Sequence, residues 1–450
     1  TGQSLWVDEL LTWQMIRPGI AASFLEQFFD SIQGPLYGAV AWPLIRIQDS
    51  PLMLRLPAAL AGVAVIPVFG LFVSRLTGGR AARLAVLLVA LNPFHVWYSQ
   101  EGRGYAFLML FSVLMALAYL DLVRGEGGYR TAVLFAVATA AAALSNLGGL
   151  FLWAAMGLTL LLCDLPRSRR GWAVAVVAFG LGFLLVTPWL LKASGIWAID
   201  RVVPGSGTGD ALRGETTFSP LAWPYTVFTF FFGYSLGPSL RELHQPDRLA
   251  LIRHAWPLLV GGAVPVTLGL AGSLVGMDRR RVTLWLWVLV PVLVLTLLAM
   301  RNVKPWNPRY VAMVLPWLLA LTGWGLARLP RRLSVGGTLL LIGLTLCSLG
   351  NYYGNAKYAK ADVRSAAAFL TEANPGNDAL LVPVVSSVFK YYYMGEADVV
   401  ETHGRQVLAD QPAAEEFCAE VLTGRTACWL VLGREWYFDP AGHLPRAMSR

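Results

Sequence analysis

The sequence predicts a polytopic α-helical membrane protein that carries a small C-terminal α/β soluble domain. Of its 450 residues, 56% are hydrophobic and 14% are charged, a composition outside the usual range of soluble domains. Apolar runs of the length that crosses a bilayer recur between residues 55 and 350. After residue 350 the sequence becomes more polar, and short apolar strands alternate with helical segments, the pattern of an α/β domain.

The membrane-spanning helices are predicted from the length of the apolar runs. A helix needs about twenty apolar residues to cross the roughly 30 Å hydrocarbon core. About ten segments meet or approach this length: 55–74, 82–98, 104–123, 131–146, 148–163, 172–191, 255–276, 282–300, 310–328 and 334–350. Two further apolar segments, 35–47 and 221–236, are too short or too interrupted, so we expect them to form helices at the membrane surface.

Arginine clusters indicate the orientation of these spans. The formal charge is +9, but the arginines lie in short clusters between apolar runs and not on one basic face, which argues against nucleic-acid binding. If the two short segments do not span, these clusters share one side, and the positive-inside rule makes that side cytoplasmic. The clusters lie within 75–83, 124–130, 167–170, 279–281 and 328–332. We therefore expect a multi-pass protein of the cytoplasmic (inner) membrane.

The chain divides into a membrane domain, 1–350, and an extracytoplasmic α/β domain, 351–450. Ten spans leave both ends of the sequence on the outer face, and because it begins at Thr1 without a Met we expect one further span upstream. The soluble domain is predicted to contain helices at 362–373 and 387–393 and strands at 379–383 and 428–432. Its two cysteines, Cys418 and Cys428, are compatible either with a disulfide in an oxidising compartment or with free thiols.

Charged and aromatic residues gather on the predicted outer face. Asp8 and Glu9 adjoin the first apolar segment, where a carboxylate is costly unless it is paired, reaches water or has a function. A second acidic position, Glu101, is followed by Arg103, and a basic aromatic loop occupies 301–310. A carboxylate can act as a general base, and the arginine fork binds two phosphate oxygens. The sequence therefore predicts one chamber in which acidic groups and a phosphate-binding cation meet.

Several sequence blocks carry a resemblance to a known family. They are Trp6-Val-Asp-Glu, Gly34-Pro-Leu-Tyr, Leu54-Arg-Leu-Pro, the basic turn at 75–83, the block 92–105 that contains Ser-Gln-Glu-Gly-Arg-Gly-Tyr, and Pro308-Arg-Tyr followed by Pro316. In order and spacing these blocks resemble the GT-C membrane glycosyltransferases, in the branch of protein O-mannosyltransferases and lipid A aminoarabinose transferases. The resemblance runs from residue 4 to about 330.

The resemblance implies an inverting glycosyltransferase that moves a sugar from a polyprenyl-phosphate donor lipid to an acceptor protein, lipid or glycan on the outer face. The candidate catalytic residues are Asp8, Glu9 and Glu101: Asp8 corresponds to the proposed base of the family, Glu9 is its acidic neighbour, and Glu101 matches the second acidic position. The region that meets the donor phosphate corresponds to Arg103, Lys304, Arg309 and Tyr310. Further pocket candidates are His95, Tyr98 and Gln100, although the first two more often pack against neighbouring helices.

Two departures from the family bear on metal binding. Family members often carry His where this chain has Gly34 and Asn146. The three acids Asp8, Glu9 and Glu101 have the oxygen ligands that a hard divalent cation prefers, but the branch is not expected to need one for transfer. We therefore predict no metal and no other cofactor. The glycine-rich loop 203–210 lacks the lysine of a phosphate-binding loop, and we expect it to act as a mobile cover.

Each of these residues also has a simpler interpretation. Asp8 and Glu9 could cap a surface helix, Glu101 and Arg103 could form a structural ion pair, and Arg309 could be an interfacial anchor. Two other functions also fit a multi-pass chain: a transporter of a carrier-linked glycan or solute, and a non-catalytic membrane subunit. Transporters place their polar site near the membrane midplane and often show two similar halves, whereas here the acids gather at one face.

Overall fold

The computed structural model describes residues 3–17, 34–166, 168–193, 218–244, 248–373, 376, 378–400, 410–425, 427–433, 435, 439 and 441–449. The chain divides into two compact units. The helical unit comprises Thr12–Gly233 and Leu259–Leu349. The C-terminal unit comprises Gly350–Arg450 together with Thr1–Leu11 and Tyr234–Leu258, so it contains the expected soluble domain and two further segments. The loop 203–210 lies outside the described residues.

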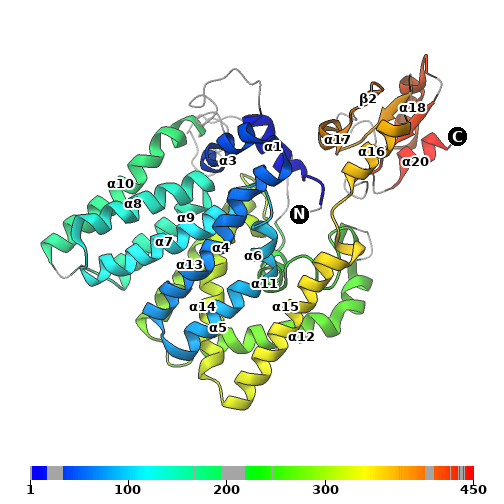
Figure 1. The fold of residues 1–450 in the computed structure, drawn as a ribbon. Helices are drawn as coiled ribbons and strands as arrows, with labels where there is room; N and C mark the ends of the chain where they lie inside the picture. Colours follow the sequence, from blue (N-terminus) through cyan, green and yellow to red (C-terminus); the bar gives the residue numbers. More distant parts are fainter. Residues whose placement is uncertain are drawn as a thin grey trace. The chain divides into compact units, whose positions relative to one another are not determined.

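Helices make up most of the chain before residue 355 (Figure 1). In order they are α1 (Val7–Ile16), α3 (Pro35–Ile47), α4 (Pro51–Leu76), α5 (Gly79–Leu91), α6 (Pro93–Tyr98), α7 (Tyr105–Arg124), α8 (Gly128–Ser145), α9 (Gly148–Leu162), α10 (Arg169–Ala193), α11 (Ala222–Phe232), α12 (Arg248–Leu274), α13 (Arg279–Met300), α14 (Leu315–Arg328) and α15 (Arg331–Gly354). Short 3₁₀ helices are η3 (Glu242–His244) and η4 (Pro308–Val314).

Eight of the described helices are long and apolar enough to cross a membrane. They are α4, α7, α8, α10, α12, α13, the segment Pro308–Arg328 that contains η4 and α14, and α15. They match eight of the predicted spans. The other two predicted spans fall below this length: 148–163 forms the 15-residue α9, and 82–98 forms two helices, α5 and α6. The segments 35–47 and 221–236 form the short helices α3 and α11, as expected.

The break inside 82–98 has a local cause. Asn92 has an extended backbone (ψ 121°), the conformation favoured before a proline, and Pro93 has no N–H to continue the hydrogen bonds of α5. The Asn92 side chain accepts a hydrogen bond from the His95 N–H at 2.8 Å and so caps α6. Its amide donates to the carbonyl of Phe230 at 2.7 Å. Asn92 therefore fixes a break that the apolar run alone conceals.

Buried aromatic rings form part of the core of the helical unit. Phe72 of α4, Trp287 of α13 and Trp317 of α14 are fully buried, and each tryptophan ring centroid lies 5.1 to 6.2 Å from the other rings of the cluster. The Trp287 indole donates to Thr159 of α9 at 3.1 Å, and Tyr119 of α7 pairs with the same hydroxyl at 3.0 Å. Five helices, α4, α7, α9, α13 and α14, are therefore joined around one centre. Figure 1 shows α7, α8, α9 and α10 running alongside one another.

The C-terminal unit contains a three-stranded parallel sheet in the order β2-β1-β3. Its elements are η5 (Ala356–Tyr358), α16 (Val363–Ala373), β1 (Ala379–Leu381), α17 (Ser386–Tyr392), β2 (Asp398–Val400), α18 (Gln411–Leu422), β3 (Cys428–Leu430) and α20 (His443–Met448). The predicted helices and strands are confirmed, and β2, α18 and α20 are additional.

The core of this α/β domain lies between the sheet and its C-terminal helices. Leu381, Ala414 and Leu444 are buried together with Cys418, and Cys428 packs against them. Both thiols are free, and burial raises the pKa of each. In this structure the two cysteines therefore act as small apolar side chains of the core.

Candidate active site

The first turn of α1 carries the two carboxylates, and its geometry separates their roles. Trp6 precedes the helix, and its backbone N–H donates to Glu9 Oε2 at 2.9 Å, which is the acidic half of a capping box. Glu9 is completely buried, whereas Asp8 is half-buried. Neighbouring helical residues point about 100° apart. Glu9 therefore caps the helix, and Asp8 lies on a different side of α1 and is less deeply buried.

The buried Glu9 carboxylate pairs with a lysine that the sequence analysis did not select. Lys360 lies in the segment between η5 and α16, and its ammonium is 3.9 Å from Glu9 Oε2 and 5.5 Å from the ring centroid of Trp6. The Lys360 side chain is 7% exposed. The sequence after residue 350 is polar and contains several lysines, and no motif there distinguishes Lys360 from the others. No signal in the sequence could therefore have identified it.

Residues just before α1 are bound to the same domain. The Ser4 hydroxyl donates to Asp362 at 3.2 Å and accepts from the Arg364 N–H at 3.1 Å, while the Leu5 N–H donates to the Tyr392 hydroxyl at 3.0 Å. Hydrogen bonds from Ser365 and Ser4 hold the pKa of Asp362 below its ordinary value. Its stabilising contribution is therefore complete above that ordinary value and is lost as the pH falls through the lowered pKa.

The second half of α1 belongs to the helical unit and is bound there. Arg103 donates to the Thr12 hydroxyl at 3.2 Å, and the Trp13 indole donates to Asp49 at 2.6 Å. Arg46 of α3 donates to the carbonyl of Ile16 at 3.3 Å. Arg103 is thus paired with the second half of α1 through Thr12.

Glu101 lies in the turn between α6 and α7. It is 3% exposed, and its carboxylate accepts a hydrogen bond from the Trp97 indole at 3.2 Å, one helical turn earlier. The Arg103 N–H donates to the carbonyl of Glu101 at 2.7 Å, which tightens the turn. A carboxylate so thoroughly buried is costly in the charged state unless polar groups surround it. The turn thus places an acidic group inside the protein, where the Trp97 indole is one of its partners.

The basic aromatic loop lies beside this turn. Asn307 caps η4 by accepting from the Arg309 N–H at 3.2 Å. The Arg309 guanidinium carbon lies 6.0 Å from the ring of Tyr105, the first residue of α7, and 5.3 Å from the ring of Tyr310. The Lys304 ammonium is 4.4 Å from the Tyr310 ring. Within the helical unit, the fold therefore brings together the second acidic turn and two predicted phosphate-binding cations.

The remaining pocket candidates, His95, Tyr98 and Gln100, are buried or half-buried. His95 and Tyr98 are each 3% exposed, and the Tyr98 ring packs on Phe94 and Tyr105 at 4.6 and 4.8 Å. Gln100 is half-buried. His95 and Tyr98 are thus core residues of α6, as their apolar surroundings in the sequence suggest. The Tyr105 ring packs against Tyr98 and also lies near the Arg309 guanidinium. Tyr105 therefore connects α6 with the basic aromatic loop.

Close backbone packing explains one departure from the family pattern. Gly34, which precedes α3, lies so near the end of α8 that an added Cβ would be 2.3 Å from the carbonyl oxygen of Ser145. Gly104 meets the same carbonyl, with an added Cβ at 2.5 Å. No larger side chain fits at residue 34 unless the backbone moves. A histidine at this position, as in many family members, is therefore incompatible with the packing here.

Substitution of Gly34 by Ala is expected to lower the free energy of unfolding by about 1–3 kcal/mol, the usual cost of overpacking. Gly38→Ala is the matched control on the same helix, because an added Cβ there meets Ile16 at 3.5 Å, an ordinary contact. Thermal unfolding of both variants in one detergent measures the difference. Equal melting temperatures for the two variants would contradict the close approach at residue 34.

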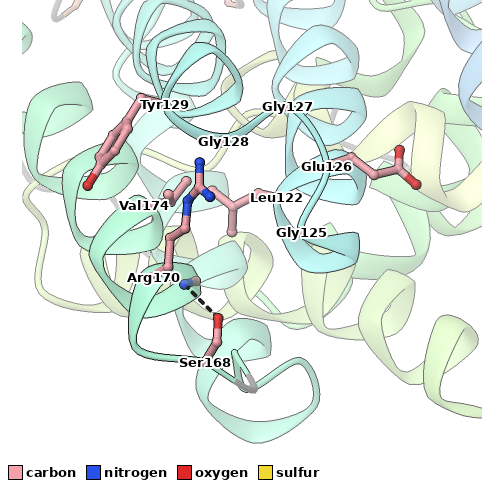
Figure 2. Close-up of a pocket in the computed structure, with 10 residues that line it drawn as sticks. Leu122, Gly125, Glu126, Gly127, Gly128, Tyr129, Ser168, Arg170 and Val174 are labelled. Carbon is pink, nitrogen blue, oxygen red and sulfur yellow. Dashed lines mark hydrogen bonds between the residues drawn. The ribbon is translucent and has the colours of Figure 1, made fainter.

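A separate cavity of about 400 Å³ lies at the other end of α7 (Figure 2). It is lined by Leu122, Gly125, Glu126, Gly127, Gly128, Tyr129, Ser168, Arg170, Gly171 and Val174. The Arg170 side chain reaches toward Gly128, and the Glu126 side chain points away from Arg170. The 20 residues of α7 place this cavity about 30 Å from the Glu101 turn. Over the described residues its lining contains none of the predicted site residues, so it is not part of the candidate site.

A metal centre was one alternative for the acidic residues. Across the described part of the chain, no group of three or more His, Cys, Asp or Glu side chains lies close enough to hold one ion. Glu9 is engaged by Lys360 and by the Trp6 N–H. Two of the groups that contact this carboxylate are therefore an ammonium and a backbone N–H, which are hydrogen-bond donors and not metal ligands.

The chain has the GT-C fold, the fold shared by a superfamily of membrane glycosyltransferases. ArnT from Cupriavidus metallidurans in the apo state is similar over 95% of this chain and 85% of that chain, with a TM-score of 0.57 and 13% identity. The same protein bound to undecaprenyl phosphate gives a TM-score of 0.53 at 13% identity, covering 91% of this chain and 85% of that chain.

A third similar structure is the Archaeoglobus fulgidus oligosaccharyltransferase tethered with an acceptor peptide, with a TM-score of 0.50 and 13% identity over 93% of this chain and 63% of that chain. No family model matches the sequence, and a search of curated proteins finds no relative. At this level of identity the likeness establishes the fold, and the fold is the one that the sequence blocks predicted.

Proposed function

We propose that this protein is an inverting glycosyltransferase that moves a sugar from a polyprenyl-phosphate lipid to an acceptor on the outer side of the membrane. The observation that carries the proposal is the meeting, in the helical unit, of the Glu101 turn with the loop of Lys304 and Arg309 at Tyr105. The fold supports it, because similar structures include an ArnT bound to undecaprenyl phosphate.

In this mechanism Asp8 acts as the general base. The acceptor hydroxyl or amine gives its proton to the Asp8 carboxylate, and the acceptor atom attacks the anomeric carbon from the side opposite the phosphate. The bond between that carbon and the phosphate oxygen breaks, and its electron pair leaves on the polyprenyl phosphate. The proton then passes from Asp8 to water. A single displacement of this kind inverts the anomeric configuration.

Cations stabilise the leaving phosphate. Negative charge grows on the phosphate oxygen as the bond breaks, and donors already in place stabilise that charge without reorganising. Arg309 offers a planar fork of N–H donors to two oxygens, and Lys304 adds a compact charge. Both stand over the Tyr310 ring. Arg103 extends the cationic region, and Glu101 accepts hydrogen bonds from hydroxyl groups of the donor sugar.

The proposal assigns the arginine-rich ends of the spans to the cytoplasm and the C-terminal domain to the outer face. It also treats transfer as independent of a metal ion, since Glu9 is committed to its ion pair. A strong chelator should then leave the rate unchanged. A rate that falls with chelation and recovers with a divalent cation would overturn this part of the proposal.

Sugar transfer by the purified protein in lipid nanodiscs tests the function. A set of polyprenyl-phosphate sugars is incubated with extracted envelope acceptors, and free polyprenyl phosphate is measured. The proposal predicts its release together with a glycosylated acceptor of inverted anomeric configuration. A transporter would move the donor between leaflets with its sugar still attached. If every donor tested crosses the membrane intact and none releases polyprenyl phosphate, the enzymatic assignment would be overturned.

A further inference from the structure

We propose that Lys360, in the link between α15 and the α/β domain, is a positioning residue for sugar transfer: it neutralises Glu9 and thereby fixes the turn of α1 that carries Asp8. This inference rests on the proposed function, because Asp8 must be the base for its position to matter. It assigns the C-terminal domain a part in the transfer step.

The first support is the burial of both partners. Glu9 is 0% exposed and Lys360 is 7% exposed, with 3.9 Å between the ammonium and Oε2. A charge removed from water needs a partner of opposite sign, and removing one member of such a pair leaves an uncompensated buried charge. The Lys360 ammonium also stands over the Trp6 ring at 5.5 Å, which adds a cation–π attraction.

The second support is that the pair acts on the helix start itself. Oε2 of Glu9, the atom nearest Lys360, is also the acceptor for the Trp6 N–H at 2.9 Å. A movement of the Glu9 carboxylate therefore disturbs the capping hydrogen bond and the turn that it closes. Asp8 lies in that turn, one residue before Glu9. Reacting groups misplaced by about 1 Å can cost on the order of 100-fold in rate.

The third support is that Lys360 belongs to a larger attachment. Ser4 and Leu5 are hydrogen-bonded to Asp362 and Tyr392 of the same domain. These hydrogen bonds hold the chain that leads into α1, whereas Lys360 holds the carboxylate inside the helix. The attachment spans residues on both sides of the cap at Trp6. It therefore fixes the direction of the helix start as well as its position.

The test compares Lys360→Met with Lys357→Met. Methionine keeps an unbranched stem and removes the charge. Lys357 is the matched control because it pairs with Glu242 at 2.9 Å in the same unit but is 42% exposed. Lys360→Met is expected to lower kcat by roughly 10- to 100-fold with the donor KM within about twofold of wild type. Hydrogen exchange at the amides of Leu5 and Trp6 should become faster. Lys357→Met should change none of these.

A double variant separates positioning from general damage. Lys360→Met combined with Glu9→Gln leaves no uncompensated buried charge, and it should recover folding yield and part of kcat relative to Lys360→Met alone. If Lys360→Met does not fold, the double variant and Lys360→Arg replace it in the same measurements. Unchanged exchange at Leu5 and Trp6, or unchanged kcat, would overturn the positioning role. A wild-type chain without any transfer activity would instead overturn the proposed function.

Discussion

Replacement of Asp8 by Asn is expected to lower the transfer rate by roughly 10²–10⁴-fold, the usual contribution of a general base. The amide keeps the shape of the side chain but cannot take the acceptor proton. The donor should still bind with nearly unchanged affinity, because the proposed mechanism assigns the phosphate to Arg309 and not to Asp8. Initial rates at saturating donor and a separate measurement of donor binding give the two quantities.

Asp121→Asn is the control for this experiment. Asp121 pairs with Arg75 at 3.0 Å near the arginine-rich end of the helices, and both side chains are about one third exposed, so the pair contributes little to stability. The same change of carboxylate to amide there should leave the rate within about twofold of wild type. An Asp8→Asn protein with full activity would remove the base from the mechanism.

Replacement of Arg309 by Ala is expected to weaken donor binding by roughly 10- to 150-fold. A hydrogen bond to a charged group contributes about 1.5–3 kcal/mol, and each 1.4 kcal/mol is about tenfold in Kd. Arg309→Lys should recover part of the loss, because it restores the charge but not the two-oxygen fork. Binding of a polyprenyl phosphate without a sugar isolates the phosphate contribution, since no reaction can follow.

Arg170→Ala provides the matched control for Arg309. Arg170 lines the cavity at the far end of α7, and within the described part of the chain no hydrogen bond or ion pair engages its guanidinium. Removing it should therefore cost no stability and leave donor binding unchanged. The reverse pattern, with binding lost in Arg170→Ala and retained in Arg309→Ala, would move the phosphate site to that cavity.

Most of the helical architecture could be predicted because apolar length is a direct physical requirement of the bilayer. Eight predicted spans are helices of sufficient length. The error at 82–98 arose because hydropathy averages over Asn92 and Pro93, two residues that break the backbone pattern without lowering the apolar character of the run. The short helices α3 and α11 were predicted from their length for the same reason, whereas their expected place at the membrane surface stays a prediction.

Candidate site residues could be selected from the sequence only where they lie close together in the chain or inside the sequence blocks that resemble the GT-C family. Glu101 and Arg309 were both selected, and the fold places their segments together at Tyr105. The pairing of Glu9 with Lys360 was not predictable, because the two residues lie about 350 positions apart in the chain. The exclusion of histidine at Gly34 likewise depends on a backbone carbonyl of α8.

Native mass spectrometry of the lipid bound to wild type and to Asp8→Asn tests the central claim most directly. Each protein is loaded with the same polyprenyl-phosphate sugar in the presence of acceptor. The account predicts that wild type carries polyprenyl phosphate without its sugar, whereas Asp8→Asn carries the intact donor. Intact donor on both proteins, or the sugar-free lipid on both, would contradict a transfer step that depends on Asp8.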